Sequence, residues 1–423
     1  YSTDADWLVP HFEKMLYDNA QLVSLYSEAY QLEHKELYKN VVYETLAFVE
    51  REMTSAEGAF YSSLDADSEG EEGKFYVWTK QKLDEILQDK ATVFNDYYNI
   101  SERGNWEEHK NILHRKQTDE KVAKRNDISV ADLQKSISAS KEILMKARKN
   151  RIRPGLDDKV LTSWNALMLK GYVDAYRAFG EKNFLEKAVK NASFISKKCM
   201  QKDGRLNRNY KNGKSNINAF LDDYSLTIEA FIALYQATFE EKYLLEAKKL
   251  TDYAIAHFFD EKSGMFFYTS DLDKALIARK MELSDNVIVG SNSSMAKCLY
   301  YLSHYMYNKD YQAKTEQMLT NIKPQIARNP AFYSNWIWVM IQFVQPPYEV
   351  AIVGKDFAKK RQALDQYFLP NVLFLGGKTE GKLPLLESKL VGNKTMIYVC
   401  QQKACKFPTE EVEKALKLLV ITA

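Results

Sequence analysis

The chain of 423 residues is 45% hydrophobic and 27% charged, a composition typical of a globular protein with one large domain or two to three ordinary ones. Its 59 basic and 57 acidic residues leave a net charge of +2, so charge gives no reason to expect nucleic acid or a membrane as a partner. No stretch approaches the roughly 20 apolar residues that span a bilayer, and four cysteines are too few for a disulfide scaffold. We therefore expect a cytoplasmic protein in a reducing compartment.

The first 150 residues alternate between helical and irregular patterns. Apolar residues recur near helical spacing over 7–32 and 36–54, which predicts two helices. A loop is expected over 58–73, where Gly, Ser and acidic residues gather, and a short strand over 74–79. A polar helix is expected near 130–150.

From residue 158 the pattern becomes regular and predicts helical hairpins. The expected pairs are 159–179 with 183–201, 220–239 with 241–259, and 291–307 with 309–327, followed by a single helix over 330–344. Repeated antiparallel helix pairs of this length imply an (α/α) toroid or solenoid.

The composition changes at Pro346-Pro347, where we place a domain boundary. The expected domains are a toroid over 1–345 and a small α/β tail over 346–423. The tail's expected elements are strands at 348–353, 371–375 and 395–400 and helices near 356–368 and 409–419. Cys400 and Cys405 have a C-x4-C spacing that fits neither redox nor zinc motifs, which favours structural thiols.

Three acidic motifs recur at near-equal spacing, and each precedes an apolar helical run. They are Asp157-Asp158, Asp222-Asp223 and Asp285-Asn286, whose first members are 65 and 63 residues apart. This period suits a repeated hairpin that presents a carboxylate at the same end each time. Paired carboxylates are what glycoside chemistry needs, since one protonates the leaving oxygen while the other activates water or attacks carbon. The alternative is helix capping, because Asp is a preferred N-cap residue and complements the helix dipole.

Two further segments combine polar residues in ways that point to a site. Residues 7–22 place His11 and Asp18 on one face of an otherwise apolar helix start, which indicates either a cavity-facing stripe or a satisfied buried network. The loop over 65–73 begins with Asp65 and Asp67, but its twelfth position is Tyr76 and not the Glu of a calcium loop. We therefore expect carboxylates at a cleft rim and no metal.

The sequence VPHFEKMLYDNA at residues 9–20 resembles the signature of the spermatogenesis-associated protein 20 family. Further blocks that carry the resemblance are 65–78, 157–165, 220–224, and Asp285 with Asn292 and Ser293. The resemblance implies a mainly α fold, an (α/α) toroid of six hairpins similar to glycosidases and to N-acylglucosamine 2-epimerase. It also implies a longer protein with an N-terminal thioredoxin-like domain as a partner. Gly155 stands where the family commonly has His, which leaves His11 as the main imidazole candidate.

Together these observations predict a carbohydrate-active enzyme, a glycoside hydrolase or an N-acylglucosamine 2-epimerase-like enzyme, with a carboxylate-lined central cleft. The predicted catalytic residues are Asp158, Asp223 and His11, acting on a sugar-like small molecule without cofactor or metal. The predicted substrate-binding residues are Asp65, Asp67, Trp164, Asn165, Asp222, Tyr224, Asp285 and Asn292. The alternative is a non-catalytic toroid that binds a glycan or protein client and works with the thioredoxin-like domain.

Overall fold

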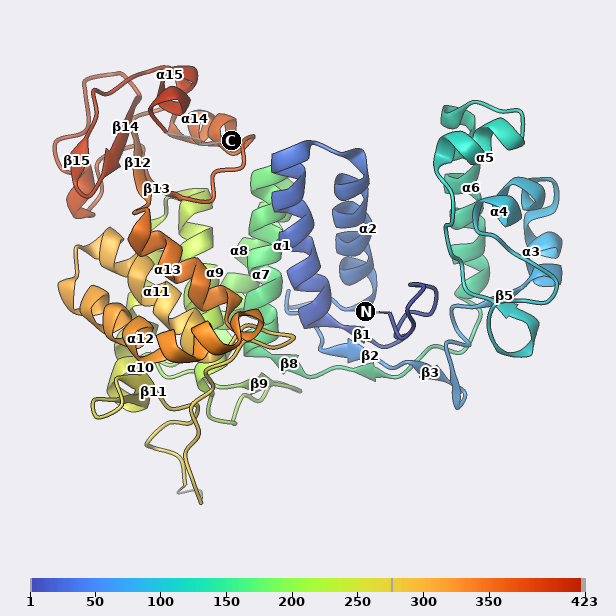
Figure 1. Cartoon of the computed structure of the whole chain (residues 1–423), viewed down its shortest axis with the longest axis horizontal. Coiled ribbons are helices and arrows are strands. Elements are labelled where there is room, and N and C mark those ends of the chain that lie inside the picture. Colours follow the sequence, from blue (N-terminus) through green and yellow to red (C-terminus); the bar gives the residue numbers. More distant parts are fainter. Residues whose placement is uncertain (1, 275–276, 420–423) are drawn as a thin grey trace. The chain divides into compact units, whose positions relative to one another are not determined.

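The computed structural model describes residues 2–274 and 277–419 of the chain (Figure 1). The chain divides into two compact units, each with its own core. The small unit comprises Tyr1–Met15 and Ser63–Asp157, and the large unit comprises Leu16–Ser62 and Asp158–Ala423. These limits differ from the expected boundary at 346, and the division into 1–345 and 346–423 stays a prediction.

The large unit is an array of helical hairpins, each with an inner and an outer helix (Figure 1). The hairpins are α1 (Leu16–Glu33) with α2 (Glu36–Glu52), α7 (Thr162–Phe179) with α8 (Lys182–Phe194), α9 (Leu221–Thr238) with α10 (Glu241–Phe258), and α11 (Ser291–Met306) with α12 (Lys309–Arg328). A further inner helix, α13 (Ser334–Val344), packs on α11, and α1, α7, α9 and α11 pack side by side in that order. The expected fold class is confirmed: mainly α, an (α/α) toroid of helical hairpins with a small C-terminal α/β tail.

The sequence of each helix explains whether it is inner or outer. α9 is buried at most positions along its length, because its apolar residues surround the helix. α10 and α12 instead bury one stripe and carry polar residues on the other side. α7 ends at Gly180, whose φ of 73° lies in the left-handed region that glycine adopts without strain. α8 continues into a π-helical turn, Ile195–Cys199.

Short antiparallel strand pairs connect the helices of the large unit. β8 (Val160–Leu161) pairs with β9 (Asn209–Tyr210) in front of α7, and β10 (Phe259–Asp260) pairs with β11 (Met265–Phe266) after α10. Among the described residues, no helix is both long and apolar enough to cross a membrane.

The small unit corrects three expectations for the first 80 residues. The helix expected over 7–32 begins only at Leu16, because β1 (Lys14–Met15) pairs with β2 (Ser63–Leu64), which pairs in turn with β7 (Leu156–Asp157). The loop expected over 58–73 contains a hairpin of β3 (Asp67–Ser68) and β4 (Glu71–Glu72). The strand expected over 74–79 is reduced to β5 (Trp78–Thr79), which pairs with β6 (Lys110–Asn111).

Four helices complete the small unit around a separate apolar core. They are α3 (Lys80–Leu87), α4 (Ala91–Tyr97), α5 (Asp119–Arg125) and α6 (Val130–Arg148). Leu83, Phe94 and Leu133 lie at the centre of this core and are almost fully buried.

The C-terminal tail belongs to the large unit and forms a four-stranded sheet in the order β13-β12-β14-β15. Its elements are β12 (Tyr348–Val353), α14 (Phe357–Leu364), β13 (Val372–Gly377), β14 (Met396–Gln401), β15 (Ala404–Cys405) and α15 (Val412–Leu418). β12 runs parallel to β13 and antiparallel to β14, and all its residues are buried, as expected for a central strand covered on both faces.

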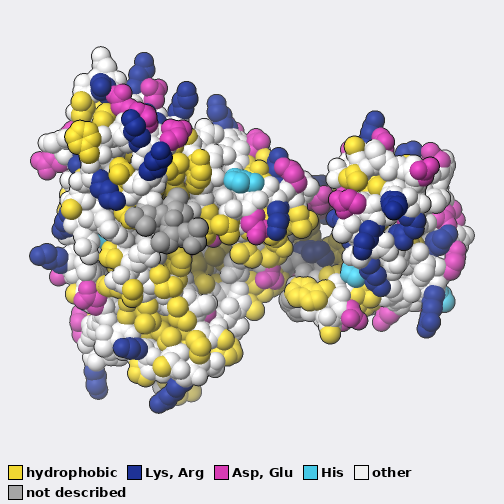
Figure 2. All heavy atoms as spheres, turned by 45° about the horizontal axis from the view of Figure 1, so that its top comes forward, with side chains coloured by type: hydrophobic (Ala, Val, Ile, Leu, Met, Phe, Trp, Pro, Cys, Tyr) yellow, Lys and Arg dark blue, Asp and Glu magenta, His cyan; other side chains and the backbone are white. Residues whose placement is uncertain are grey.

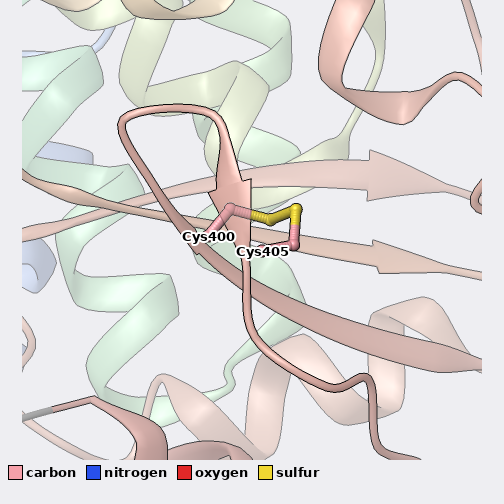
Figure 3. Close-up of a disulfide and its surroundings, with 2 residues drawn as sticks. All are labelled: Cys400 and Cys405. Carbon is pink, nitrogen blue, oxygen red and sulfur yellow. A yellow bond between two sulfur atoms is a disulfide. The ribbon is translucent and has the colours of Figure 1, made fainter.

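A disulfide joins Cys400 and Cys405 across the β14–β15 hairpin (Figure 3). The sequence favoured structural thiols at these positions, whereas the structure joins them in a disulfide. The two residues are directly opposite each other in the strand register, which places their side chains within bonding reach. The spacing alone did not reveal this, because the tight turn at Gln402 and Lys403 is needed to bring the strands together.

Candidate functional site

Asp223 joins the N-termini of two neighbouring inner helices. Its carboxylate accepts hydrogen bonds from the N–H of Ser163 in α7 (2.9 Å) and of Phe220 before α9 (3.0 Å). It also pairs with Arg208 at 3.0 Å and is fully buried. Burial and the neighbouring Asp222 carboxylate raise the pKa of Asp223 to about 7, and Arg208 with the hydrogen bonds from Phe220 and Ser163 opposes this shift. The bonds of Asp223 are those of a capping residue shared by two helices.

Asp285 does the same for the next two inner helices. One carboxylate oxygen accepts from the N–H of Gly290 (2.9 Å) and the hydroxyl of Ser293 (2.7 Å) at the start of α11. The other accepts from the N–H of Asn335 in α13 (2.9 Å). Capping thus accounts for the bonds of the second and third acidic motifs.

Asn165 and Asn292 occupy equivalent structural positions in α7 and α11. The side-chain oxygen of Asn165 accepts from Phe60 N–H (2.8 Å), and its amide group donates to Phe60 C=O (2.9 Å). Asn292 makes the same two bonds with Phe266, at 2.8 and 2.9 Å. Both amides are fully buried. Each one clamps a connecting segment onto its helix, which directs these groups away from any ligand.

Two further aspartates of the acidic motifs, Asp158 and Asp222, form ion pairs. Asp158, with a 42% exposed side chain, pairs with Lys211, and this hydrogen bond lowers the pKa of Asp158. Asp222 pairs with Arg208 at 3.1 Å. Arg208 therefore holds both members of the second motif.

The predicted aromatic residues differ in accessibility. The hydroxyl oxygen of Tyr224 accepts from Leu206 N–H (2.8 Å), and Tyr224 is fully buried. Trp164 is half-buried and contacts Tyr17 edge-on, with ring centroids 4.8 Å apart. Of the two, only Trp164 offers a face to solvent.

His11, Asp65 and Asp67 belong to the small unit, whereas the other predicted site residues belong to the large unit. His11 lies 3.4 Å from the carboxylate of Glu13. Asp65 and Asp67 are exposed, and Asp65 accepts a hydrogen bond from Asp67 N–H (3.3 Å). Across residues 2–274 and 277–419, no group of three or more His, Cys, Asp or Glu side chains is arranged to hold a metal ion.

A cavity of about 300 Å³ lies among the inner helices of the large unit, and the sequence analysis did not identify it. Helices α1, α7, α9, α11 and α13 all contribute to its lining. Its charged residues are Glu28, Lys170, Asp174, Arg177, Glu229 and Lys297. The available signal was the helical spacing of charged residues in largely buried helices, such as 170, 174 and 177 in α7.

Ion pairs organise the polar wall of the cavity. Lys170 pairs with Asp174 at 2.7 Å, and Lys297 pairs with Glu229 at 2.8 Å. Three acidic and three basic residues line the cavity, so its formal charges balance. A balanced polar lining suits a neutral, hydroxyl-rich ligand better than a strongly charged one.

Glu28 and Glu229 lie in environments that shift their pKa values in opposite directions. The protein atoms around Glu28 raise its pKa and Asp174 adds to this shift, whereas Lys170, Lys297 and Arg177 oppose it; the residue is nevertheless exposed to solvent. Burial alone would also raise the pKa of Glu229, but Lys297 and Lys170 hold it below its ordinary value. Two carboxyl groups whose pKa values are shifted in opposite directions can act as a proton donor and a base.

Aromatic side chains form one corner of the same cavity. The indole N–H of Trp338 in α13 donates to the hydroxyl of Tyr301 in α11 (3.3 Å), and both residues line the cavity. Aromatic faces beside polar groups are common in pockets that bind ring-shaped ligands.

On the face shown in Figure 2, basic and acidic side chains are interspersed and do not separate into regions of one sign.

Several solved structures resemble the chain distantly. A sugar epimerase from a ruminal bacterium has a TM-score of 0.46 and 12% identity, covering 74% of this chain and 61% of its own. D-mannose isomerase has a TM-score of 0.39 and 12% identity, and the match covers 74% of this chain and 76% of the isomerase. Cellobiose 2-epimerase from Bacillus thermoamylovorans has a TM-score of 0.37 and 11% identity, and the match covers 76% of this chain and 79% of the epimerase. These likenesses are too distant to bear on the activity of this chain.

Relatives by sequence match almost all of the chain, whereas no family model matches it. Human spermatogenesis-associated protein 20 is 30% identical over 99% of this chain and 59% of its own length, as is the mouse protein of that name. An uncharacterized protein of Caenorhabditis elegans is 28% identical over 99% of this chain and 62% of its own length. The chain therefore spans about three fifths of these relatives. The resemblance carried by the motifs is confirmed, and the chain is a relative of the spermatogenesis-associated protein 20 family along almost its whole length.

Proposed function

We propose that the protein is a carbohydrate-active enzyme that binds a sugar-like small molecule in the cavity of the large unit. The observation that carries this proposal is one polar cavity lined by two carboxyl groups, those of Glu28 and Glu229, beside the aromatic side chains of Tyr301 and Trp338. The opposite directions of the two pKa shifts support it. The volume of about 300 Å³ is at the small end of ligand pockets, which hold roughly 300–1,000 Å³. One sugar ring is therefore the natural size of ligand.

The two carboxyl groups have complementary roles in this proposal. Glu28, which retains its proton above the ordinary pKa, donates it to the leaving oxygen. Glu229, which is held ionised by Lys297, acts as the base that activates water or as the nucleophile. Hydrolysis is favoured over epimerisation, because epimerisation more naturally uses an imidazole pair and no histidine is among the described residues that line the cavity.

The sequence-based assignment of Asp158, Asp223 and His11 stays a competing prediction. Asp223 is occupied by two N–H groups and Arg208, and Asp158 pairs with Lys211. Both aspartates already have hydrogen-bond or ion-pair partners in the protein without ligand. We therefore prefer the carboxyl groups of the cavity as the catalytic pair. The two assignments can be separated in a single assay.

The test is a panel of mono- and disaccharides followed by calorimetry for binding and by NMR for turnover. We expect Glu229→Gln and Glu28→Gln to lower turnover by roughly 10²–10⁴-fold, the usual contribution of a general acid or base. Glu316→Gln is the matched control, because Glu316 lies on the exposed side of the outer helix α12.

Each other outcome has a defined meaning. Loss of turnover in Asp158→Asn alone would move the site to the acidic motifs. Binding without turnover in every condition would favour the non-catalytic toroid. No binding of any sugar by the unaltered protein would contradict the proposal.

A further inference from the structure

The C-terminal tail contributes a wall to the cavity. After α14 the chain runs past the cavity into the start of β13, and six residues of this stretch line the cavity: Tyr367, Phe368, Leu369, Pro370, Val372 and Leu373. Gln31, Arg177 and Gln236 also line the cavity, and each lies two residues before the end of its helix. The tail segment 367–373 therefore lies at the C-terminal ends of the inner helices.

The cavity does not extend to the other end of the inner helices. Its first lining residues are Lys170 in α7, Glu229 in α9 and Lys297 in α11, six or more residues into each helix. The layer nearer the N-termini contains the fully buried Asn165 and Asn292 with their clamped segments. The described lining residues of α7, α9 and α11 thus stop short of the N-termini of these helices.

Both ends of the tail segment are bonded to inner helices. Before it, Asp365 pairs with Arg177 (2.9 Å), and its C=O accepts from the side chain of Gln31 (2.6 Å). Asp365 also pairs with Arg361, and both are almost fully buried. This anchor connects the tail to α1 and α7.

After the segment, the backbone of Phe374 forms the second anchor. Its N–H donates to the side chain of Gln236 in α9 (3.2 Å), and its C=O accepts from the hydroxyl of Tyr305 in α11 (3.1 Å). Four inner helices thus hold the segment from both sides. A chain that is bonded at both ends within ten residues forms a fixed wall.

From this placement we infer that the tail segment makes the cavity a blind pocket that admits one sugar unit or the end of a chain, and that Tyr367 sets this length limit at its rim. The inference rests on the proposed function and specifies its substrate class. Tyr367 lines the cavity and is 46% exposed, so it stands where cavity and solvent meet. Its ring restricts the space into which further sugar units would extend from a bound terminal unit.

The test compares glucose, mannose and N-acetylglucosamine with their linear oligomers of two to four units. We expect the unaltered protein to release single units from chain ends. Tyr367→Ala should raise kcat/KM for the tetramer relative to the dimer by about tenfold or more. Phe407→Ala is the matched control, because Phe407 is a 90% exposed aromatic residue of the same tail that does not line the cavity. Thermal unfolding should show that both variants remain folded.

Products of mixed length from the unaltered protein would overturn the inference, because they require a chain to pass through the site. An equal length preference in the protein and its Tyr367→Ala variant would also overturn it. In both cases the proposed enzymatic function would stand. Failure of the proposed function has a separate signature, because no sugar would then bind or react in any variant.

Discussion

At the scale of single residues, the same side-chain chemistry recurs at matching places in different hairpins. Asn165 and Asn292 each bond the N–H and C=O of one Phe in a connecting segment. Asp223 and Asp285 each bond N–H groups at the starts of two inner helices. Polar groups buried with all partners in place specify one arrangement of the chain, because any other arrangement leaves them unpaired.

Replacing either asparagine should therefore destabilise the large unit. Asn165→Ala and Asn292→Ala each leave a buried N–H and C=O without partners, which costs roughly 1–3 kcal/mol for each unpaired group. We expect a lower denaturation midpoint in both variants, measured by far-UV circular dichroism. Asp158→Asn, which alters a surface ion pair, should leave the midpoint unchanged. Midpoints that stay unchanged in the asparagine variants would refute the clamp.

The opposite pKa shifts of Glu28 and Glu229 predict a bell-shaped pH profile of turnover. Glu229 must be ionised, and its pKa lies below the ordinary value of 4.5, so activity falls only as the pH drops through that lower pKa. Glu28 must be protonated, and its pKa lies above 4.5, so activity falls as the pH rises through that higher pKa. Both limbs should appear in a kcat profile.

The variant Glu28→Gln tests the alkaline limb of this profile. Its remaining activity should no longer fall as the pH rises, because glutamine does not titrate. An alkaline limb that persists unchanged in Glu28→Gln would assign that limb to another group.

At the scale of elements, sequence periodicity predicted most of the large unit. The helices expected at 220–239 and 241–259 are α9 and α10 within one residue at each end, and the strand expected at 348–353 is β12. The prediction of a helix over 7–32 is wrong for the residues before Leu16. There the pairing of β1 with the distant strand β2 overrides the helical spacing of the apolar residues. The cavity was missed because its charged residues come from four helices that are far apart in sequence.

The β14–β15 hairpin provides a prediction about the four cysteines. Cys199 and Cys298 are buried and Cys400 is bonded to Cys405. A thiol reagent should therefore find no reactive group in the native protein and two after mild reduction. The disulfide closes a very short loop, so its loss should cost only about 2 kcal/mol. Thiols that react before reduction would show that the hairpin is open.

At the scale of the whole molecule, two separate apolar cores predict two unfolding transitions. Leu83 and Phe94 belong to the core of the small unit, and Leu169 and Tyr235 belong to that of the large unit. Scanning calorimetry should resolve two transitions. Phe94→Ala should lower the midpoint temperature of the small unit's transition, by an amount corresponding to a loss of roughly 3–5 kcal/mol in unfolding free energy. A single transition that shifts as a whole would mean that the two cores unfold as one.

The pairing of β2 with β7 means that the longer segment of the small unit, Ser63–Asp157, begins and ends at adjacent points. Ser63 is paired with Asp157, and Leu64 with Leu156, so the two crossings form one narrow ladder. An Asn-Gly turn can connect two antiparallel strands of this kind. The intervening residues 65–155 can therefore be excised and Leu64 rejoined to Leu156 by such a turn. For protein engineering, the segment 65–155 is the part of the small unit that a foreign domain can replace, whereas Tyr1–Met15 of the same unit stays in place.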